Sequence, residues 1–186
     1  MQDKVAIFID GGYLTKVLKE SFNSCDIDFS QLSSYLAEND HILRTYYYNC
    51  MPYKSNTPSS GDSARYENMQ RFINALERLD HYEVRLGKLE YRGRNKEGRP
   101  IFTQKRVDIL LGCDLVLLSA KGKIGKAIII TGDSDFIPAI EIAKNEGVEI
   151  ELVYEDNHKP HQNLMTIADI RKCLTMEEIE KIKISR

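Results

Sequence analysis

Three short acidic stretches stand at the ends of apolar runs and could together hold a metal ion. They are Ile9-Asp10-Gly11-Gly12, Val107-Asp108-Ile109 and Thr131-Gly132-Asp133-Ser134-Asp135-Phe136. The first and third follow β-branched runs, so their carboxylates are expected where buried strands end. Two unit charges about 4 Å apart repel by about 4 kcal/mol at an effective dielectric constant near 20. A cluster of such carboxylates needs raised pKa values, basic partners or a divalent cation.

Oxygen ligands suit Mg²⁺ or Mn²⁺, which retain bound water and bind substrate phosphates. One or two such ions could activate a water molecule and stabilise the leaving oxygen of a phosphodiester. We therefore expect four aspartates to act as metal ligands and catalytic residues: Asp10, Asp108, Asp133 and Asp135. Asp114 lies about 240° around an ideal helix from Asp108. It is expected beside the site or on the helix surface, with a role as a metal ligand left open.

Each carboxylate also has a purely structural interpretation. Asp10 precedes Gly11, a common pairing in turns. Asp133 or Asp135 could cap the next helix, since Pro138 suits its first turn. Asp108 would lie in the first turn of its own helix, where the helix dipole favours a negative charge. One aspartate is enough to cap a helix, so two close together exceed the structural need.

Alternating strand and helix patterns predict the scaffold. Apolar and β-branched runs predict strands at 5–9, 42–49, 82–89, 127–131 and 148–153. Helical spacing predicts helices at 13–22, 31–38 with Ser30 as N-cap, around 69–79, 105–119 and 135–145. Residues 91–103 are interpreted as a charged hairpin, and 105–119 as a buried helix. This alternation indicates a parallel sheet with helices on both faces, in which ligands bind beyond the carboxyl ends of the strands.

Length and composition favour one globular α/β domain over residues 1–186, with a core at about 4–170 and a short helical C-terminal tail. The chain is 42% hydrophobic and 29% charged, and it has no apolar run near the ~20 residues of a membrane span. Met1 to Lys4 leads directly into a strand, so we expect no signal peptide, no membrane association and a cytoplasmic location. The four cysteines are widely spaced, which favours reduced thiols over a zinc site.

The chain resembles the NYN domain family, particularly its LabA-like (DUF88) branch within the PIN-like nuclease superfamily. The resemblance rests on Val5–Tyr13, Lys105–Asp108 with Asp114-Leu115, and Ile130–Phe136, with a weaker match at Asn163-Leu164 and Ala168-Asp169. It implies a PIN-like three-layer sandwich with central strands in the order 3-2-1-4-5. It also implies a Mg²⁺- or Mn²⁺-dependent ribonuclease site at the aspartates named above. The chain departs from the family pattern at two places. Many relatives have a small polar residue and Asn where this chain has Gly12-Tyr13, and relatives often have Gly where this chain has Arg106.

A local basic segment could bind RNA on a chain whose net charge is −2. Residues 85–106 contain eight basic and two acidic residues, and such a patch gives salt-dependent contacts to phosphates. The basic residues expected to bind RNA are Lys105, Arg106, Arg92, Arg94 and Arg99. Tyr91 and Phe102 could stack on unpaired bases. The alternative is a solvated loop whose charges only maintain solubility.

The sequence therefore predicts a metal-dependent endoribonuclease acting on single-stranded or structured RNA, and it leaves room for a homodimer. The main alternative is a non-catalytic RNA-binding or regulatory module that keeps the same fold. A small-molecule phosphatase is a third possibility.

Overall fold

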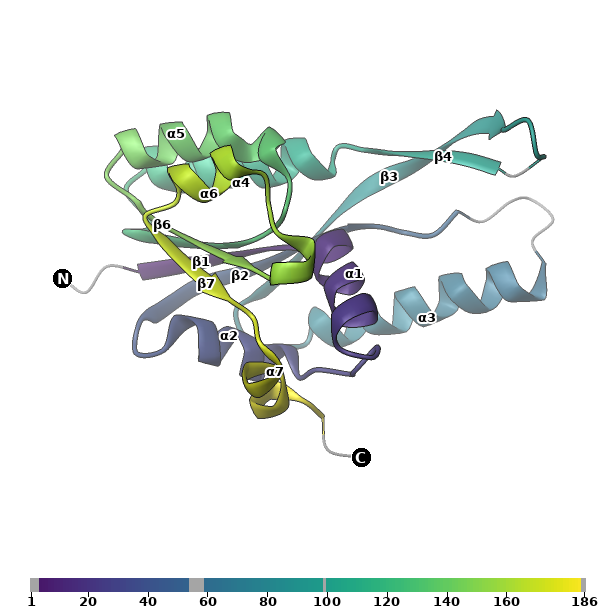
Figure 1. Cartoon of the computed structure of the whole chain (residues 1–186), viewed down its shortest axis with the longest axis horizontal. Coiled ribbons are helices and arrows are strands. Elements are labelled where there is room, and N and C mark those ends of the chain that lie inside the picture. Colours follow the sequence, from purple (N-terminus) through teal and green to yellow (C-terminus); the bar gives the residue numbers. More distant parts are fainter. Residues whose placement is uncertain (1–3, 54–58, 99, 185–186) are drawn as a thin grey trace.

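The apolar run Val5–Ile9 forms the middle strand of a seven-stranded sheet, and all five residues are fully buried. The computed structural model describes residues 4–53, 59–98 and 100–184. Its strands are β1 (Lys4–Asp10), β2 (His41–Cys50), β3 (Tyr82–Arg94), β4 (Pro100–Lys105), β5 (Lys126–Ile130), β6 (Glu149–Tyr154) and β7 (Ile170–Cys173). Helices cover both faces of this sheet, giving the expected three-layer α/β architecture (Figure 1).

The strand order is β4-β3-β2-β1-β5-β6-β7. The expected order of five central strands describes β3-β2-β1-β5-β6, while β4 and β7 extend the sheet at its two edges. All pairs are parallel except β3 with β4. The β1–β5 register sets Ile9 beside Ile130. Asp10 and Thr131, the next residues of the two segments, therefore emerge together at the carboxyl edge of the sheet.

Two apolar clusters lie on opposite faces of the sheet. The helices are α1 (Gly11–Ser21), α2 (Phe29–Ala37), α3 (Ser60–Leu76), α4 (Val107–Ala120), α5 (Ile137–Asn145), α6 (Gln162–Ile167) and α7 (Met176–Ile182), with 3₁₀ helices η1 (Ser134–Phe136) and η2 (Asp156–His158). Residues of α1, α2, α3 and α7 pack on one face, and residues of α4, α5 and α6 on the other. Tyr47 joins the first cluster, while Tyr46 and Tyr48 join the second, as strand alternation requires.

Two expectations about helices are wrong in detail. The N-cap of α2 is Asp28, whose Oδ1 accepts hydrogen bonds from the backbone N–H groups of Ser30 (2.8 Å) and Gln31 (3.1 Å). Ser30 therefore lies inside the first turn. Helix α4 is not buried all round, because Ile109 and Leu117 project into solvent. They lie eight positions apart, on the side of α4 that faces away from the sheet.

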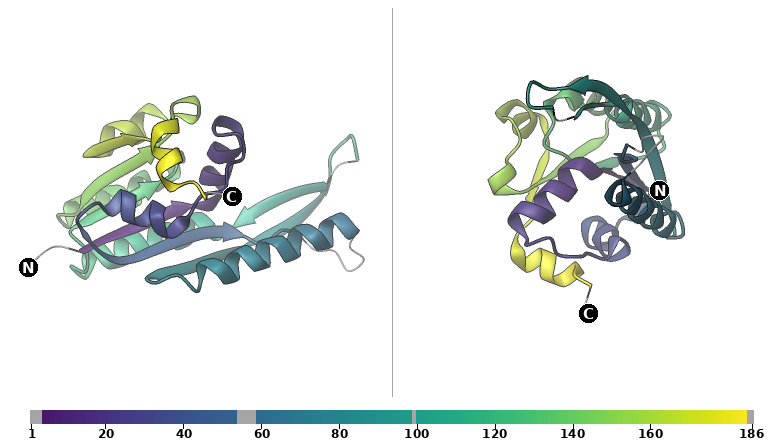
Figure 2. Two further views of the ribbon diagram at one scale, coloured as in Figure 1. Left: turned by 90° about the horizontal axis from the view of Figure 1, so that it is seen from below. Right: turned by 90° about the vertical axis from the view of Figure 1, so that its right-hand side faces the viewer.

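Strand β3 changes partner halfway along its length. Its first part pairs with β2 up to Gly87, and its second part pairs with β4 from Lys88 onward. We call residues 88–105 the β3–β4 arm. The arm and the start of α3 extend together beyond the rest of the fold (Figures 1 and 2).

Gly87 is required where the arm leaves the sheet. A Cβ at this position would lie 2.5 Å from Cγ2 of Val107, 2.6 Å from the carbonyl oxygen of Lys105 and 3.1 Å from Sγ of Cys50. The absence of a side chain therefore lets the end of β4 and the start of α4 return against β3. This close approach fixes the position from which Asp108 projects.

None of the helices in the described ranges is long and apolar enough to cross a membrane. All four cysteines are free thiols.

Candidate active site

Asp10 ends β1 and caps α1. Its Oδ1 accepts a hydrogen bond from the backbone N–H of Tyr13 at 3.1 Å, so Asp10 is the N-cap of this helix rather than part of an Asp-Gly turn. Its Oδ2 accepts a second hydrogen bond, from Thr131 Oγ1 at 3.1 Å. Gly11 is needed beneath it, because a Cβ there would meet the phenol of Tyr47 at 2.5 Å. The carboxylate is thus held from two sides and keeps further lone pairs for a ligand.

Asp133 and Asp135 lie on the turn that follows β5. The hydroxyl of Thr131 accepts from the backbone N–H of Asp133 at 3.1 Å, and Asp133 Oδ1 accepts from the backbone N–H of Asp135 at 2.9 Å. Asp133 therefore caps the 3₁₀ helix η1 rather than α5 itself. Buried Phe136 anchors this turn from below. Asp135 is solvent-exposed. Because Asp133 already caps η1, the carboxylate of Asp135 is not needed as a helix cap.

Asp108 reaches the same region from the other direction along the chain. It lies in the first turn of α4, after Arg106, whose backbone adopts the left-handed conformation with φ of 77°. Val107 is buried and fixes the start of the helix, while Asp108 is solvent-accessible. The left-handed residue ends β4 and turns the chain into α4.

Neighbouring carboxylates affect the ionisation of Asp108 and of Asp10. Partial desolvation raises the pKa of Asp108 above its usual range, and the charges of Asp133, Asp10 and Asp135 raise it further. Burial also raises the pKa of Asp10, opposed by hydrogen bonds from Tyr13, Thr131 and Gly12, and supported by the charge of Asp133. The ends of β1 and β5 and the start of α4 therefore bring these four carboxylates into one electrostatic cluster.

The cluster is open rather than a closed cage. Among the described residues, no group of three or more His, Cys, Asp or Glu side chains is arranged to hold a metal ion as it stands. Mg²⁺ is commonly bound through one or two carboxylates and several water molecules. The donor chemistry of the cluster, with carboxylates alone, suits that mode of binding.

Asp114 is engaged elsewhere. Its Oδ2 accepts hydrogen bonds from Tyr48 Oη at 3.0 Å and from Arg85 Nε at 3.1 Å. Arg85 also pairs with Glu83 at 2.7 Å. Asp114 is absent from the charges that perturb Asp108 or Asp10. Its charge is compensated by an arginine on the neighbouring strand.

The expected basic patch is partly neutralised from within. Glu90 lies within salt-bridge distance of Arg92 (3.0 Å), Lys105 (3.6 Å) and Lys88 (3.9 Å). These ion pairs are solvent-exposed and weak. Because three basic side chains surround one carboxylate, the group keeps a net positive charge. Arg94 Nη1 donates to the carbonyl oxygen of Gly98 at 2.7 Å.

Arg106, a further member of the expected patch, is solvent-exposed two residues before Asp108. Arg99 lies outside the described residues.

Sequence reasoning missed one wall of the site. A cleft of about 600 Å³ is lined by Asp10 and Asp133 together with Lys16, His158 and Lys159. Lys16 comes from α1, and the other two follow β6. Because residues 155–160 follow a parallel strand, the rule that ligands bind beyond the carboxyl ends could have indicated them. No comparable signal singled out Lys16.

Tyr13 links α1 to the loop after β6, which forms this wall of the cleft. Its hydroxyl donates to the carbonyl oxygen of His158 at 3.0 Å and accepts from the backbone N–H of Glu155 at 3.1 Å. Its ring lies over Gly132, where a Cβ would meet it at 2.7 Å. The residue that departs from the family pattern therefore holds the loop after β6 against α1.

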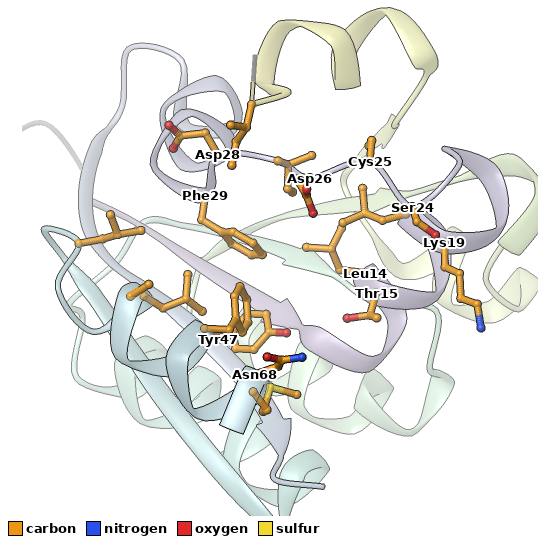
Figure 3. A pocket seen from close by; sticks show the side chains of 18 of the residues that line it. Leu14, Thr15, Lys19, Ser24, Cys25, Asp26, Asp28, Phe29, Tyr47 and Asn68 are labelled. Carbon is orange, nitrogen blue, oxygen red and sulfur yellow. The ribbon is translucent and has the colours of Figure 1, made fainter. Parts of the chain in front are cut away.

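A second cavity lies away from the carboxylates. It measures about 820 Å³ and opens between α1, α3 and the segment before α2. Leu14, Phe29 and Tyr47 are among the side chains that line it (Figure 3). None of the four clustered aspartates lines this cavity, and its walls are predominantly apolar. It is therefore distinct from the acidic cleft.

Comparisons with known proteins agree with the fold. A family model of the NYN domain matches residues 4–171. A Sinorhizobium fredii protein, y4oD, described as uncharacterized, is 30% identical over 79 residues, which cover 42% of this chain and 33% of that protein. The matched segment thus spans about a third of the relative. A crystal structure of a protein of unknown function from Vibrio parahaemolyticus superposes with a TM-score of 0.62 at 17% identity, covering 98% of this chain and 97% of that one.

Proposed function

The chain belongs to the NYN domain family, and on that premise we propose that it is a metal-dependent endoribonuclease. The observation that supports this proposal most directly is the raised pKa of Asp108, to which three carboxylates from distant parts of the chain contribute after desolvation. Like charges that raise one another's pKa favour capture of a cation. From the resemblance at Ile130–Phe136, we also propose that the chain falls within the LabA-like (DUF88) branch of the family.

Four residues would hold a divalent ion: Asp10, Asp108, Asp133 and Asp135. When bound, Mg²⁺ or Mn²⁺ supplies an activated water and charge stabilisation for phosphodiester hydrolysis. Asp114 is left out of this set, because Arg85 and Tyr48 already bind its carboxylate. In this proposal Asp114 has a structural role, because it joins α4 to Tyr48 of β2 and to Arg85 of β3.

The remaining side chains of the cleft would position the RNA. Lys16 and Lys159 line the same cleft as Asp133 and would provide cations for the phosphates on either side of the scissile bond. Lys105 and Arg106 lie just before Asp108 in the chain and would contact the strand as it enters. Thr131 holds Asp10 in orientation through its hydroxyl hydrogen bond.

The test is cleavage of single-stranded RNA in Mn²⁺ by the wild type and by Asp133→Asn. We expect loss of at least about 100-fold in rate, the usual effect of removing one electrostatic group from a reacting centre. Asp80→Asn is the matched control, since Asp80 is exposed in the turn between α3 and β3. Equal cleavage by Asp133→Asn and the wild type would overturn the proposal.

A non-catalytic RNA-binding module is the second candidate, favoured by the exposed cations Lys88, Arg92 and Lys105, which outnumber the single carboxylate of Glu90 beside them. Thermal melting in Mn²⁺ separates the two. An ion that binds only the folded protein raises its melting temperature, and the nuclease should show this rise whereas Asp10→Asn should not. A protein that binds RNA but shows no metal-dependent stabilisation would support the second candidate.

A further inference from the structure

Three aromatic rings at the β3–β4 arm belong to neither core cluster and lie together at the surface. Tyr53, Tyr91 and Phe102 are 39%, 46% and 37% exposed. Their ring centroids lie 5.9 Å apart for Tyr53–Tyr91, 5.1 Å for Tyr53–Phe102 and 5.9 Å for Tyr91–Phe102. Tyr91 and Phe102 are cross-strand partners in the hairpin, and Tyr53 joins them from the segment after β2. We call these three rings the aromatic platform.

Two arginines share a cavity with the platform. The cavity measures about 680 Å³, lies between the arm and the first turns of α3, and is lined by all three rings together with Arg65 and Arg94. Arg65 forms an exposed ion pair with Asp62 at 3.6 Å, which is weak in water, and Arg94 donates one hydrogen bond to the carbonyl oxygen of Gly98. The guanidinium groups therefore remain able to bind an anion beside the rings.

The cavity continues along β3. A second hollow of about 420 Å³ shares Tyr53 and Leu89 with the first and extends to Gly87. Gly87 approaches Val107, the residue before Asp108. Gly87, Leu89 and Tyr91 alternate along β3 and so lie on one face of it. The two hollows together thus run along β3 from the platform to Gly87.

We propose that the aromatic platform stacks unpaired RNA bases while Arg65 and Arg94 bind the adjoining phosphates, and that the strand continues along the two hollows toward Asp108. Exposed aromatic rings beside cations are the elements with which proteins hold single-stranded nucleic acid. Bases in a duplex are already stacked on one another, so the platform selects unpaired segments. The two arginines favour a polyanion over an apolar peptide. The inference rests on the proposed function for the step at Asp108, although base stacking itself requires no hydrolysis.

The geometry sets a length requirement. Tyr91 and Gly87 are four strand residues apart, or about 13 Å at the rise of a β-strand. A strand stacked on the platform must therefore extend by about 13 Å to reach Gly87, and further to reach the carboxylates. A dinucleotide can occupy one of the two places but cannot span them.

Binding is tested by fluorescence anisotropy in EDTA, in the Asp133→Asn background, so that no cleavage intervenes. The probes are a labelled oligouridine long enough to span both places and an RNA duplex of equal length. We expect Tyr91→Leu and Phe102→Leu each to weaken oligouridine binding about tenfold, the loss of one stacked base, while Tyr91→Trp restores it. Ile101→Ala is the control, because Ile101 is exposed on β4 but lies outside the platform. Melting curves verify that each variant folds.

Equal oligouridine affinity for Tyr91→Leu and Tyr91→Trp, or equal affinity for duplex and single strand, would overturn the inference. In Mn²⁺ with Asp133 intact, Tyr91→Leu should raise KM for the long oligouridine and leave dinucleotide cleavage unchanged. Loss of binding in the platform variants with no effect of Asp133→Asn on cleavage would refute the nuclease proposal alone. Unchanged binding in those variants, with cleavage abolished by Asp133→Asn, would refute only the platform.

Discussion

The hydroxyl of Thr131 joins the ends of β1 and β5 by donating to Asp10 Oδ2 at 3.1 Å while accepting from the backbone N–H of Asp133 at 3.1 Å. One buried hydroxyl thus fixes the relative position of two carboxylate-bearing segments that lie 121 residues apart. This bond favours the ionised form of Asp10, against the desolvation that raises its pKa.

Thr131→Val should move the acidic limb of the pH–rate profile to higher pH. Removing the hydrogen bond takes away one interaction that lowers the pKa of Asp10, so ionisation of Asp10 requires a higher pH. The same substitution should destabilise the fold by about 1–2 kcal/mol, because the N–H of Asp133 loses its acceptor. Rates of RNA cleavage across pH and urea unfolding measure both effects. Thr131→Ser keeps the hydroxyl, and identical pH profiles for the two variants would contradict this role.

Asp108→Asn should stabilise the metal-free protein. A carboxyl group whose pKa is raised on folding binds more protons in the native state, so stability falls as pH rises through that elevated pKa. At neutral pH the wild type therefore carries the full repulsion that Asp108→Asn relieves. We expect a melting temperature about 2–4 °C higher in EDTA, the shift that about 1 kcal/mol produces in a domain of this size.

The same variant should gain less stability than the wild type when Mn²⁺ is added. Melting curves from acid to neutral pH, with and without the ion, provide the measurement, and Asp80→Asn serves as the control. A lower melting temperature for Asp108→Asn in EDTA would mean that the helix dipole outweighs the repulsion at this position.

Tyr13→Phe should raise KM for RNA several-fold with little change in kcat. The ring remains over Gly132, but both hydrogen bonds to the loop after β6 are lost, so Lys159 is less well positioned for a phosphate. Steady-state cleavage kinetics separate the two constants. Tyr35→Phe also removes a hydroxyl that interacts with Glu178, away from the cleft, and should leave KM unchanged. An unaltered KM in Tyr13→Phe would show that the hydroxyl of Tyr13 is not needed to position the loop after β6.

Gly87→Ala should destabilise the fold by about 1–3 kcal/mol and should reduce activity measured on the folded fraction. The new Cβ would meet Val107 and the backbone of Lys105, and relief of that clash moves the start of α4 and Asp108 with it. Gly112→Ala is the control, because its Cβ would meet Ala139 at an ordinary 3.6 Å and alanine favours a helix. Calorimetry and single-turnover cleavage are the measurements.

The sequence predicted the central scaffold well because its signals are local. Val5–Ile9 and the run ending at Ile130 carry an apolar pattern that suits only a strand covered on both faces. Helix α2 was placed two residues late, since Asp28 and Ser30 are both good N-caps and only the chain path decides between them. Strand β7 was missed because Ile170–Cys173 is short, half charged and lies at an edge.

The site was predictable only in part. Carboxylates at strand ends are visible in the sequence, but compensation of Asp114 by Arg85 depends on the register between β3 and α4. The same holds for Tyr53, which joins Tyr91 and Phe102 only because the segment after β2 passes beside the hairpin. Contacts between segments far apart in the chain depend on tertiary packing, and no periodicity within either segment reveals them.

The meeting of Gly87 and Val107 makes the intervening hairpin an exchangeable module. A segment whose two ends lie side by side can be replaced by another of similar span without pulling the rest of the chain out of place. A chimera carrying a foreign hairpin between these two residues should keep the aspartates in place while acquiring a different preference for the RNA that it binds.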